Sequence, residues 1–113
     1  MKKLPVASLQ HEYDRLRTSL ARIGYISQGS VLDRSTLKSP RSGYQWTRKV
    51  SRKTITVALS PQQFQSLQQA IQNRKTLGRI IERMEKISRQ ILFATLPDTR
   101  RRKQLTTKAL GAI

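Results

Sequence analysis

The sequence predicts an α+β domain with an N-terminal helix, a three-stranded antiparallel β-sheet, a long C-terminal helix and a basic tail. Two observations carry this prediction. Residues 44–59 alternate with a period of two and are rich in β-branched and aromatic side chains, which is typical of a half-buried β-hairpin. On either side, residues 8–23 and 61–96 repeat apolar side chains every three or four positions, which is the spacing of a helix with one apolar face.

The first helix is predicted over residues 8–23, with Ser8 as its N-cap and Gly24 at the C′ position just beyond its end. We interpret its apolar stripe as a face of the core, and the alternative is a contact with a second copy or a partner helix. The stripe consists of Leu9, Tyr13, Leu16, Leu20 and Ile23.

The sheet is expected to begin with a strand near residues 29–34, which a loop at residues 38–43 follows because this segment is rich in Pro, Ser and Gly. The hairpin comes next, with its turn predicted at residues 50–52. Alternation places Tyr44, Trp46 and Arg48 on one face of the first hairpin strand.

The strongest local signal is the start of the second helix, directly after the hairpin. Ser60 is predicted as the N-cap, Pro61 as the first helical residue, and Gln63 as the partner that completes a capping box. The apolar pattern slips in phase between Ile71 and Leu77. One continuous helix is favoured over two helices that meet at a bend, because a helical glycine costs only about 1 kcal/mol.

At 113 residues the chain is expected to form one domain over residues 1–97, with a basic, disordered tail at residues 98–113. The N-terminus turns polar by Gln10, so it does not resemble a signal peptide, and no apolar run is long enough to span a bilayer. These features predict a cytoplasmic protein, associated with the nucleoid if it binds DNA.

The most unusual property is the charge. Lys and Arg number 23 against 6 acidic residues, so the net charge is +17, and no acidic residue occurs between Arg34 and Ile81. Such an excess predicts a polyanionic partner, with nucleic acid ahead of an anionic membrane. The candidate nucleic-acid-binding residues lie before the hairpin (Arg34, Lys38, Arg41), on it (Tyr44, Arg48, Lys49, Arg52, Lys53) and in the tail (Arg100, Arg101, Arg102, Lys103).

The residues needed for catalysis are scarce, so no enzyme activity, metal site or cofactor is expected. The sequence has no cysteine, and its one histidine, His11, is placed on the first helix. The few carboxylates are scattered, whereas a metal-dependent nuclease needs several together. No glycine-rich phosphate loop is present, which argues against an ATPase or GTPase.

The segments GSV at residues 29–31, GYQWTRKV at 43–50 and KTITVALSPQQ at 53–63 resemble a family of small uncharacterised prokaryotic proteins often found beside transposase genes. Members share a G-S-[VL] strand, a G-P-Y-aromatic hairpin with a G-K-[TS] turn, and a long charged helix. Their C-G-K-x-x-C-x-C loop matches TLKSPRSG here, without any cysteine, and their turn glycine matches Arg52. The resemblance implies biology linked to a mobile element.

Together these observations predict a non-catalytic accessory or regulatory protein that binds nucleic acid, DNA rather than RNA, without a membrane partner. Two alternatives stay open at this point. One is an RNA-binding or ribosome-associated protein. The other is a protein-interaction module that pairs with a second copy or a partner helix through the apolar stripes, or the remnant of a transposition protein.

Overall fold

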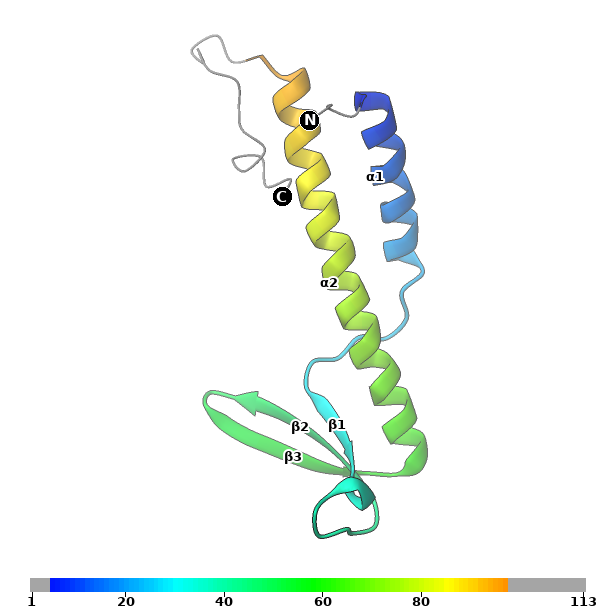
Figure 1. Cartoon of the computed structure of the whole chain (residues 1–113), viewed down its shortest axis with the longest axis vertical. Helices are drawn as coiled ribbons and strands as arrows, with labels where there is room; N and C mark the ends of the chain where they lie inside the picture. The colour runs from blue at the N-terminus through cyan, green and yellow to red at the C-terminus, as the bar shows by residue number, and fades with distance from the viewer. Residues whose placement is uncertain (1–4, 98–113) are drawn as a thin grey trace. The chain divides into compact units, whose positions relative to one another are not determined.

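The computed structural model describes residues 5–97 (Figure 1). It confirms the predicted α+β fold, with an N-terminal helix, a three-stranded antiparallel sheet and a long C-terminal helix. The elements in chain order are α1 (Val6–Ala21), β1 (Ser30–Asp33), the short 3₁₀ helix η1 (Arg34–Thr36), β2 (Tyr44–Val50), β3 (Lys53–Leu59) and α2 (Pro61–Thr95). The predicted basic tail at residues 98–113 lies outside the described residues.

The chain forms two compact units that share the helix α2. The sheet unit, residues 23–77, contains the three strands and the first part of α2. The helical unit contains α1 and the part of α2 that begins at Gly78. The 35 residues of α2 form one uninterrupted helix, as predicted. The expectation of a single domain over residues 1–97 stays a prediction.

The sheet has the strand order β1-β2-β3, and both strand pairs are antiparallel. The central strand places Trp46 opposite Val31 on one side and Val57 on the other. Because paired residues lie on the same face of a sheet, these three side chains share one face, together with Tyr44 and Arg48. β3 is an edge strand, and every residue in it except Leu59 is exposed.

The junction between β3 and α2 is fixed by the predicted capping box. The backbone N–H of Gln63 donates to Ser60 Oγ at 3.1 Å, and the backbone N–H of Ser60 donates to Gln63 Oε1 at 2.9 Å. Two N–H groups that the helix cannot pair internally are thereby satisfied. One turn further, the ring centroids of Phe64 and Tyr44 lie 4.4 Å apart, so the first turn of α2 packs against the start of β2.

The segment before β1 is held against α2 within the sheet unit. Asn73 Nδ2 donates to the carbonyl oxygen of Tyr25 at 2.9 Å, and Ser27 N–H donates to that of Ala70 at 3.2 Å. Gly29 then allows the chain to pass close to β2, because its φ is +101° and an added Cβ would lie 2.6 Å from both Thr47 O and Trp46 Nε1. This close approach explains the glycine of the GSV segment.

In the helical unit the side chains of Leu9 and Ile87 are buried, and Tyr13, Leu16 and Leu20 are half-buried, as expected for a core face. Ile23, the last residue of the predicted stripe, lies beyond the end of α1. The predicted bounds of α1 were wrong at both ends. The helix begins at Val6 after Pro5, whose carbonyl accepts from Leu9 N–H, so Ser8 is not the N-cap. It ends at Ala21 with Arg22 as the C-cap, which places Gly24 one residue beyond the C′ position.

One ion pair joins α1 to α2 in the helical unit. Arg83 Nε and Nη2 donate to the two carboxylate oxygens of Glu12 at 2.6 and 2.8 Å. These hydrogen bonds hold the pKa of Glu12 below its ordinary value, although partial burial acts in the opposite direction. Both side chains are partly exposed, at 37% for Arg83 and 29% for Glu12, so solvent screens the pair.

Removing the helix cap should weaken the fold. We expect Ser60→Ala to lower the free energy of unfolding by about 0.5–2 kcal/mol, since it leaves the Gln63 N–H without its partner. The control is Ser66→Ala, at an exposed position inside α2, which should be neutral or slightly stabilising. Urea unfolding followed by circular dichroism measures both variants, and equal midpoints would contradict a structural role for the cap.

The ion pair makes the stability of the protein depend on pH, and the lowered pKa of Glu12 gives the direction of this dependence. Because the pKa of Glu12 is lowered in the folded state, the pair stabilises the protein above the pKa of an unfolded glutamate, about 4.3. That contribution is lost as the pH falls through the lowered value. Glu12→Gln should therefore cost about 0.2–1 kcal/mol at pH 7 and progressively less below pH ~4. The control, Glu82→Gln, removes the same charge from an exposed site. A cost for Glu12→Gln that is unchanged at low pH would refute the argument.

Candidate nucleic-acid interface

The hairpin closes with a two-residue turn, not with the three-residue turn predicted at residues 50–52. Val50 pairs with Lys53 and is therefore the last residue of β2. Ser51 and Arg52 form the turn with φ of 49° and 68°. Positive φ at both central residues is the feature of type I′ turns, whose twist matches that of the two strands they join.

Arg52 occupies a backbone conformation that favours glycine. For an L-residue with a side chain, the left-handed region costs about 1–2 kcal/mol. Glycine is strongly preferred at the second turn position of type I′ hairpins. The chain therefore holds a cationic side chain at the tip of the hairpin at the expense of stability.

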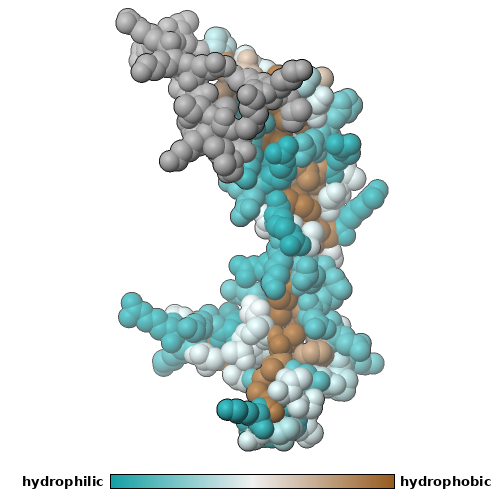
Figure 2. All heavy atoms as spheres, viewed as in Figure 1, coloured by the Kyte–Doolittle hydropathy of each residue, from teal (hydrophilic) through white to brown (hydrophobic). Residues whose placement is uncertain are grey.

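Three cations gather at this tip, and all are exposed. Lys49 lies on the sheet face opposite to that of Arg48, because the two are neighbours in β2. Lys53 starts β3 opposite Val50 and shares the face of Arg48, while Arg52 lies in the turn itself. The tip is therefore cationic on both faces and at its end. On the face visible in Figure 2, the free end of the hairpin is hydrophilic, and the hydrophobic residues of the sheet unit lie beside α2.

The loop before the hairpin is organised by Arg34. Its N–H donates to Gly43 O at 3.0 Å, and its carbonyl accepts from the N–H groups of Leu37 and Arg41. Its side chain reaches β2, where Nε donates to Gln45 Oε1 at 3.2 Å. Arg34 thus holds the loop closed, whereas the side chains of the other two loop cations, Lys38 and Arg41, are exposed.

Asp33 shapes the start of the same loop. Its carboxylate accepts hydrogen bonds from Ser35 Oγ at 2.7 Å and from Ser35 N–H at 3.0 Å, and it thereby caps η1. These bonds lower the pKa of Asp33. Sequence reasoning missed this cap, although Asp followed two residues later by Ser is a recognised local signal for it.

The structure separates the predicted site residues instead of joining them in one patch. Lys38 and Arg41 precede Tyr44, and the tip follows Val50, so the loop and the tip lie at opposite ends of β2, about 20 Å apart at 3.4 Å per residue. Tyr44 packs on Phe64, and Arg48 lies half-buried with its guanidinium carbon 5.5 Å from the centre of the Trp46 ring. The tail cations Arg100, Arg101, Arg102 and Lys103 lie outside the described residues.

Residues 5–97 offer little support for a metal site or for a membrane-spanning helix. No group of three or more His, Cys, Asp or Glu side chains lies close enough together there to hold a metal ion. Neither α1 nor α2 contains an apolar stretch that could cross a membrane. Comparisons with protein-family models, with curated proteins and with solved structures found no match to this chain. The resemblance to the transposase-associated family therefore rests on the sequence segments alone.

The strained turn can be tested with two substitutions that remove the same charge. Arg52→Gly should raise the free energy of unfolding by about 1 kcal/mol, because glycine adopts positive φ without steric cost. Lys49→Gly, inside β2, should lower it by about 0.5–1 kcal/mol. Chemical unfolding followed by the fluorescence of Trp46 measures both. A destabilising effect of Arg52→Gly would show that the turn is not strained at this residue.

Proposed function

We propose that this protein binds duplex DNA through the tip of its β2–β3 hairpin, as a non-catalytic accessory or regulatory protein. The observation that carries the proposal is the distribution of Lys49, Arg52 and Lys53, which make the exposed end of a two-stranded ribbon cationic on both faces. The family resemblance supports a link with a mobile element.

The shape of the ribbon suits a groove better than a flat surface. The major groove of B-DNA, about 12 Å wide, admits a two-stranded β-ribbon. Inside it, cations on opposite faces of the ribbon would approach the phosphates of both groove walls. A sheet that bound through one face would need its cations on that face only, whereas Lys49 and Lys53 lie on different faces.

The loop cations extend this interface. Lys38 and Arg41 precede the strand β2, whose two ends are about 20 Å apart, or roughly six base pairs at 3.4 Å per step. They can therefore contact the backbone of the same duplex when the tip occupies the groove. Contacts of this kind supply affinity and orientation but little sequence information.

The same geometry favours DNA over duplex RNA. The major groove of A-form RNA is deep and narrow, so side chains on a protein ribbon cannot reach its floor. Equal binding to DNA and RNA duplexes of one sequence at one salt concentration would contradict insertion of the hairpin. Binding that is insensitive to salt would instead favour the protein-interaction alternative.

The test compares two triple variants that lose the same charge. The hairpin variant carries Lys49→Gln, Arg52→Gly and Lys53→Gln. The control carries Arg15→Gln, Arg17→Gln and Lys75→Gln at exposed helical positions, where glutamine is a comparable helix former. If each hairpin cation neutralises one phosphate, the slope of log K against log salt should become shallower by about 2.7 in the hairpin variant. The control should bind almost as the unmodified chain does.

Fluorescence anisotropy of a labelled duplex at several salt concentrations gives these slopes. Circular dichroism of each variant verifies that the fold is retained. Indistinguishable slopes for the two variants would mean that the net charge of the chain acts as a whole, and would remove the reason to place the interface at the hairpin.

A further inference from the structure

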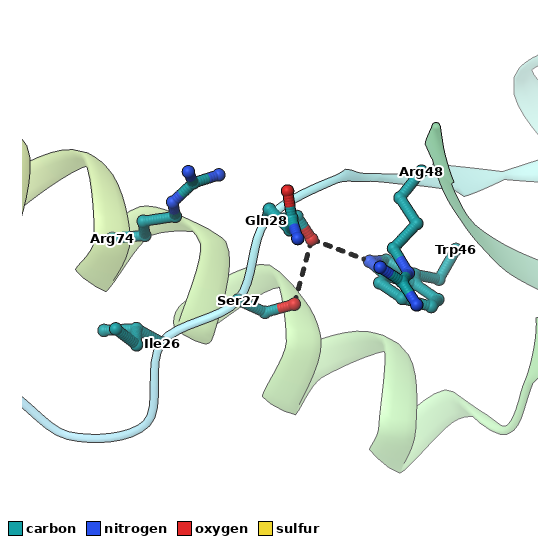
Figure 3. Close-up of a pocket in the computed structure, with 6 residues that line it drawn as sticks. All are labelled: Ile26, Ser27, Gln28, Trp46, Arg48 and Arg74. Atoms are coloured by element: carbon teal, nitrogen blue, oxygen red, sulfur yellow. Dashed lines mark hydrogen bonds between the residues drawn. The ribbon is translucent and has the colours of Figure 1, made fainter. Parts of the chain in front are cut away.

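An open pocket of about 390 Å³ lies within the sheet unit, beside the middle of β2 (Figure 3). Its volume falls in the range of small-molecule binding sites. Three parts of the chain line it: the segment before β1, the strand β2 and the helix α2. The lining residues are Ile26, Ser27, Gln28, Trp46, Arg48 and Arg74.

The charge of this pocket is entirely positive. Two guanidinium groups, those of Arg48 and Arg74, come from different elements, and no carboxylate is among the lining residues. Asp33 is the one acidic residue in the sequence of residues 23–77, and its carboxylate is bonded to Ser35. Nothing in the sequence singles out Arg74, because it resembles any other cation on the surface of a helix.

One donor of Arg48 has no acceptor within residues 5–97. Its Nε is buried, and it has no hydrogen-bond partner among the described residues. Buried donors without a partner are uncommon in folded proteins, and a bound ion or water molecule is one explanation for such a donor. The guanidinium carbon lies 5.5 Å from the centre of the Trp46 ring, an electrostatic contact that does not use the N–H donors.

One backbone acceptor at the pocket, the carbonyl oxygen of Gln28, is already used. The carbonyl oxygen of Gln28 accepts from Trp46 Nε1 at 3.0 Å and from Ser27 Oγ at 2.9 Å, as the dashed lines in Figure 3 mark. A carbonyl oxygen has two lone pairs, so this acceptor has no capacity left for an arginine. The pocket therefore combines two cationic groups with neutral polar side chains only, those of Ser27 and Gln28.

We propose that this pocket, lined by Arg48 and Arg74, binds a phosphoryl group beside the indole of Trp46. Several acceptor oxygens and a full negative charge are what two guanidinium groups recognise best. The proposal rests on the proposed function, since the natural source of the group would be the backbone of bound nucleic acid. A free phosphomonoester, such as a mononucleotide, offers the same chemistry.

Trp46 provides a direct readout, because it is the only tryptophan in the sequence. The full chain is titrated with inorganic phosphate, with a nucleoside monophosphate and with a short DNA duplex, and the tryptophan fluorescence is recorded. We expect a saturable change with at least one of the three. Saturation by the two small ligands identifies a free phosphate as sufficient, whereas saturation by the oligonucleotide alone identifies the backbone as the source.

Two neighbouring substitutions give the matched control. Arg74→Gln and Lys75→Gln each remove one positive charge from an exposed position of α2, but only Arg74 lines the pocket. Arg74→Gln should bind about tenfold more weakly, as expected for the loss of one charge-assisted hydrogen bond. Lys75→Gln should bind as the unmodified chain does. Equal affinities for the two variants, or no saturable change with any ligand, would overturn the proposal.

This outcome is separable from that of the hairpin experiment. Lys49, Arg52 and Lys53 do not line the pocket, so the hairpin variant should retain the phosphate-induced change in fluorescence. If the hairpin variant keeps the phosphate-induced change in fluorescence and its salt slope equals that of the unmodified chain, the hairpin interface is refuted and the phosphate pocket is not. If the salt slope of the hairpin variant is shallower and Arg74→Gln binds the ligands as tightly as Lys75→Gln, the phosphate pocket is refuted and the hairpin interface is not.

Discussion

The reciprocal hydrogen bonds between Ser60 and Gln63 fix the point on which the rest of the fold depends. A single residue separates the end of β3 from the start of α2, so the cap determines how the hairpin leaves the helix. The packing of Tyr44 on Phe64 adds a second attachment one turn later. From this start α2 continues for 35 residues and contributes to both compact units.

The strand β2 connects this architecture with the proposed binding. Its first residue, Tyr44, packs on α2, its middle carries Trp46 and Arg48, and its end leads into the strained turn. The strained residue Arg52 lies in a part of the fold with little packing, because the adjoining edge strand β3 is exposed along most of its length. Backbone strain at an exposed, charged tip is better explained by binding than by folding. A nucleic-acid strand that followed β2 from tip to loop would pass the pocket on its way.

The sequence by itself determined the elements whose signals lie within a few consecutive residues. Alternation in residues 44–59 defined the hairpin and the faces of its strands, and Ser60, Pro61 and Gln63 defined the start of α2 to the residue. The continuity of α2 through Gly78 also followed, since one glycine costs little in so long a helix. The concentration of positive charge around the hairpin needed no structure at all, because charge is a property of composition.

Only the tertiary structure decided how these elements use their side chains. The bond from Trp46 to Gln28 spans 18 residues and that from Asn73 to Tyr25 spans 48, and no local pattern encodes such contacts. For the same reason the sequence grouped Arg34, Tyr44 and Arg48 with the exposed cations, whereas packing engages them in the fold. Arg74 acquired a candidate role only because α2 brings it to the same pocket as Arg48, an approach set by the packing of helix, strand and connecting segment.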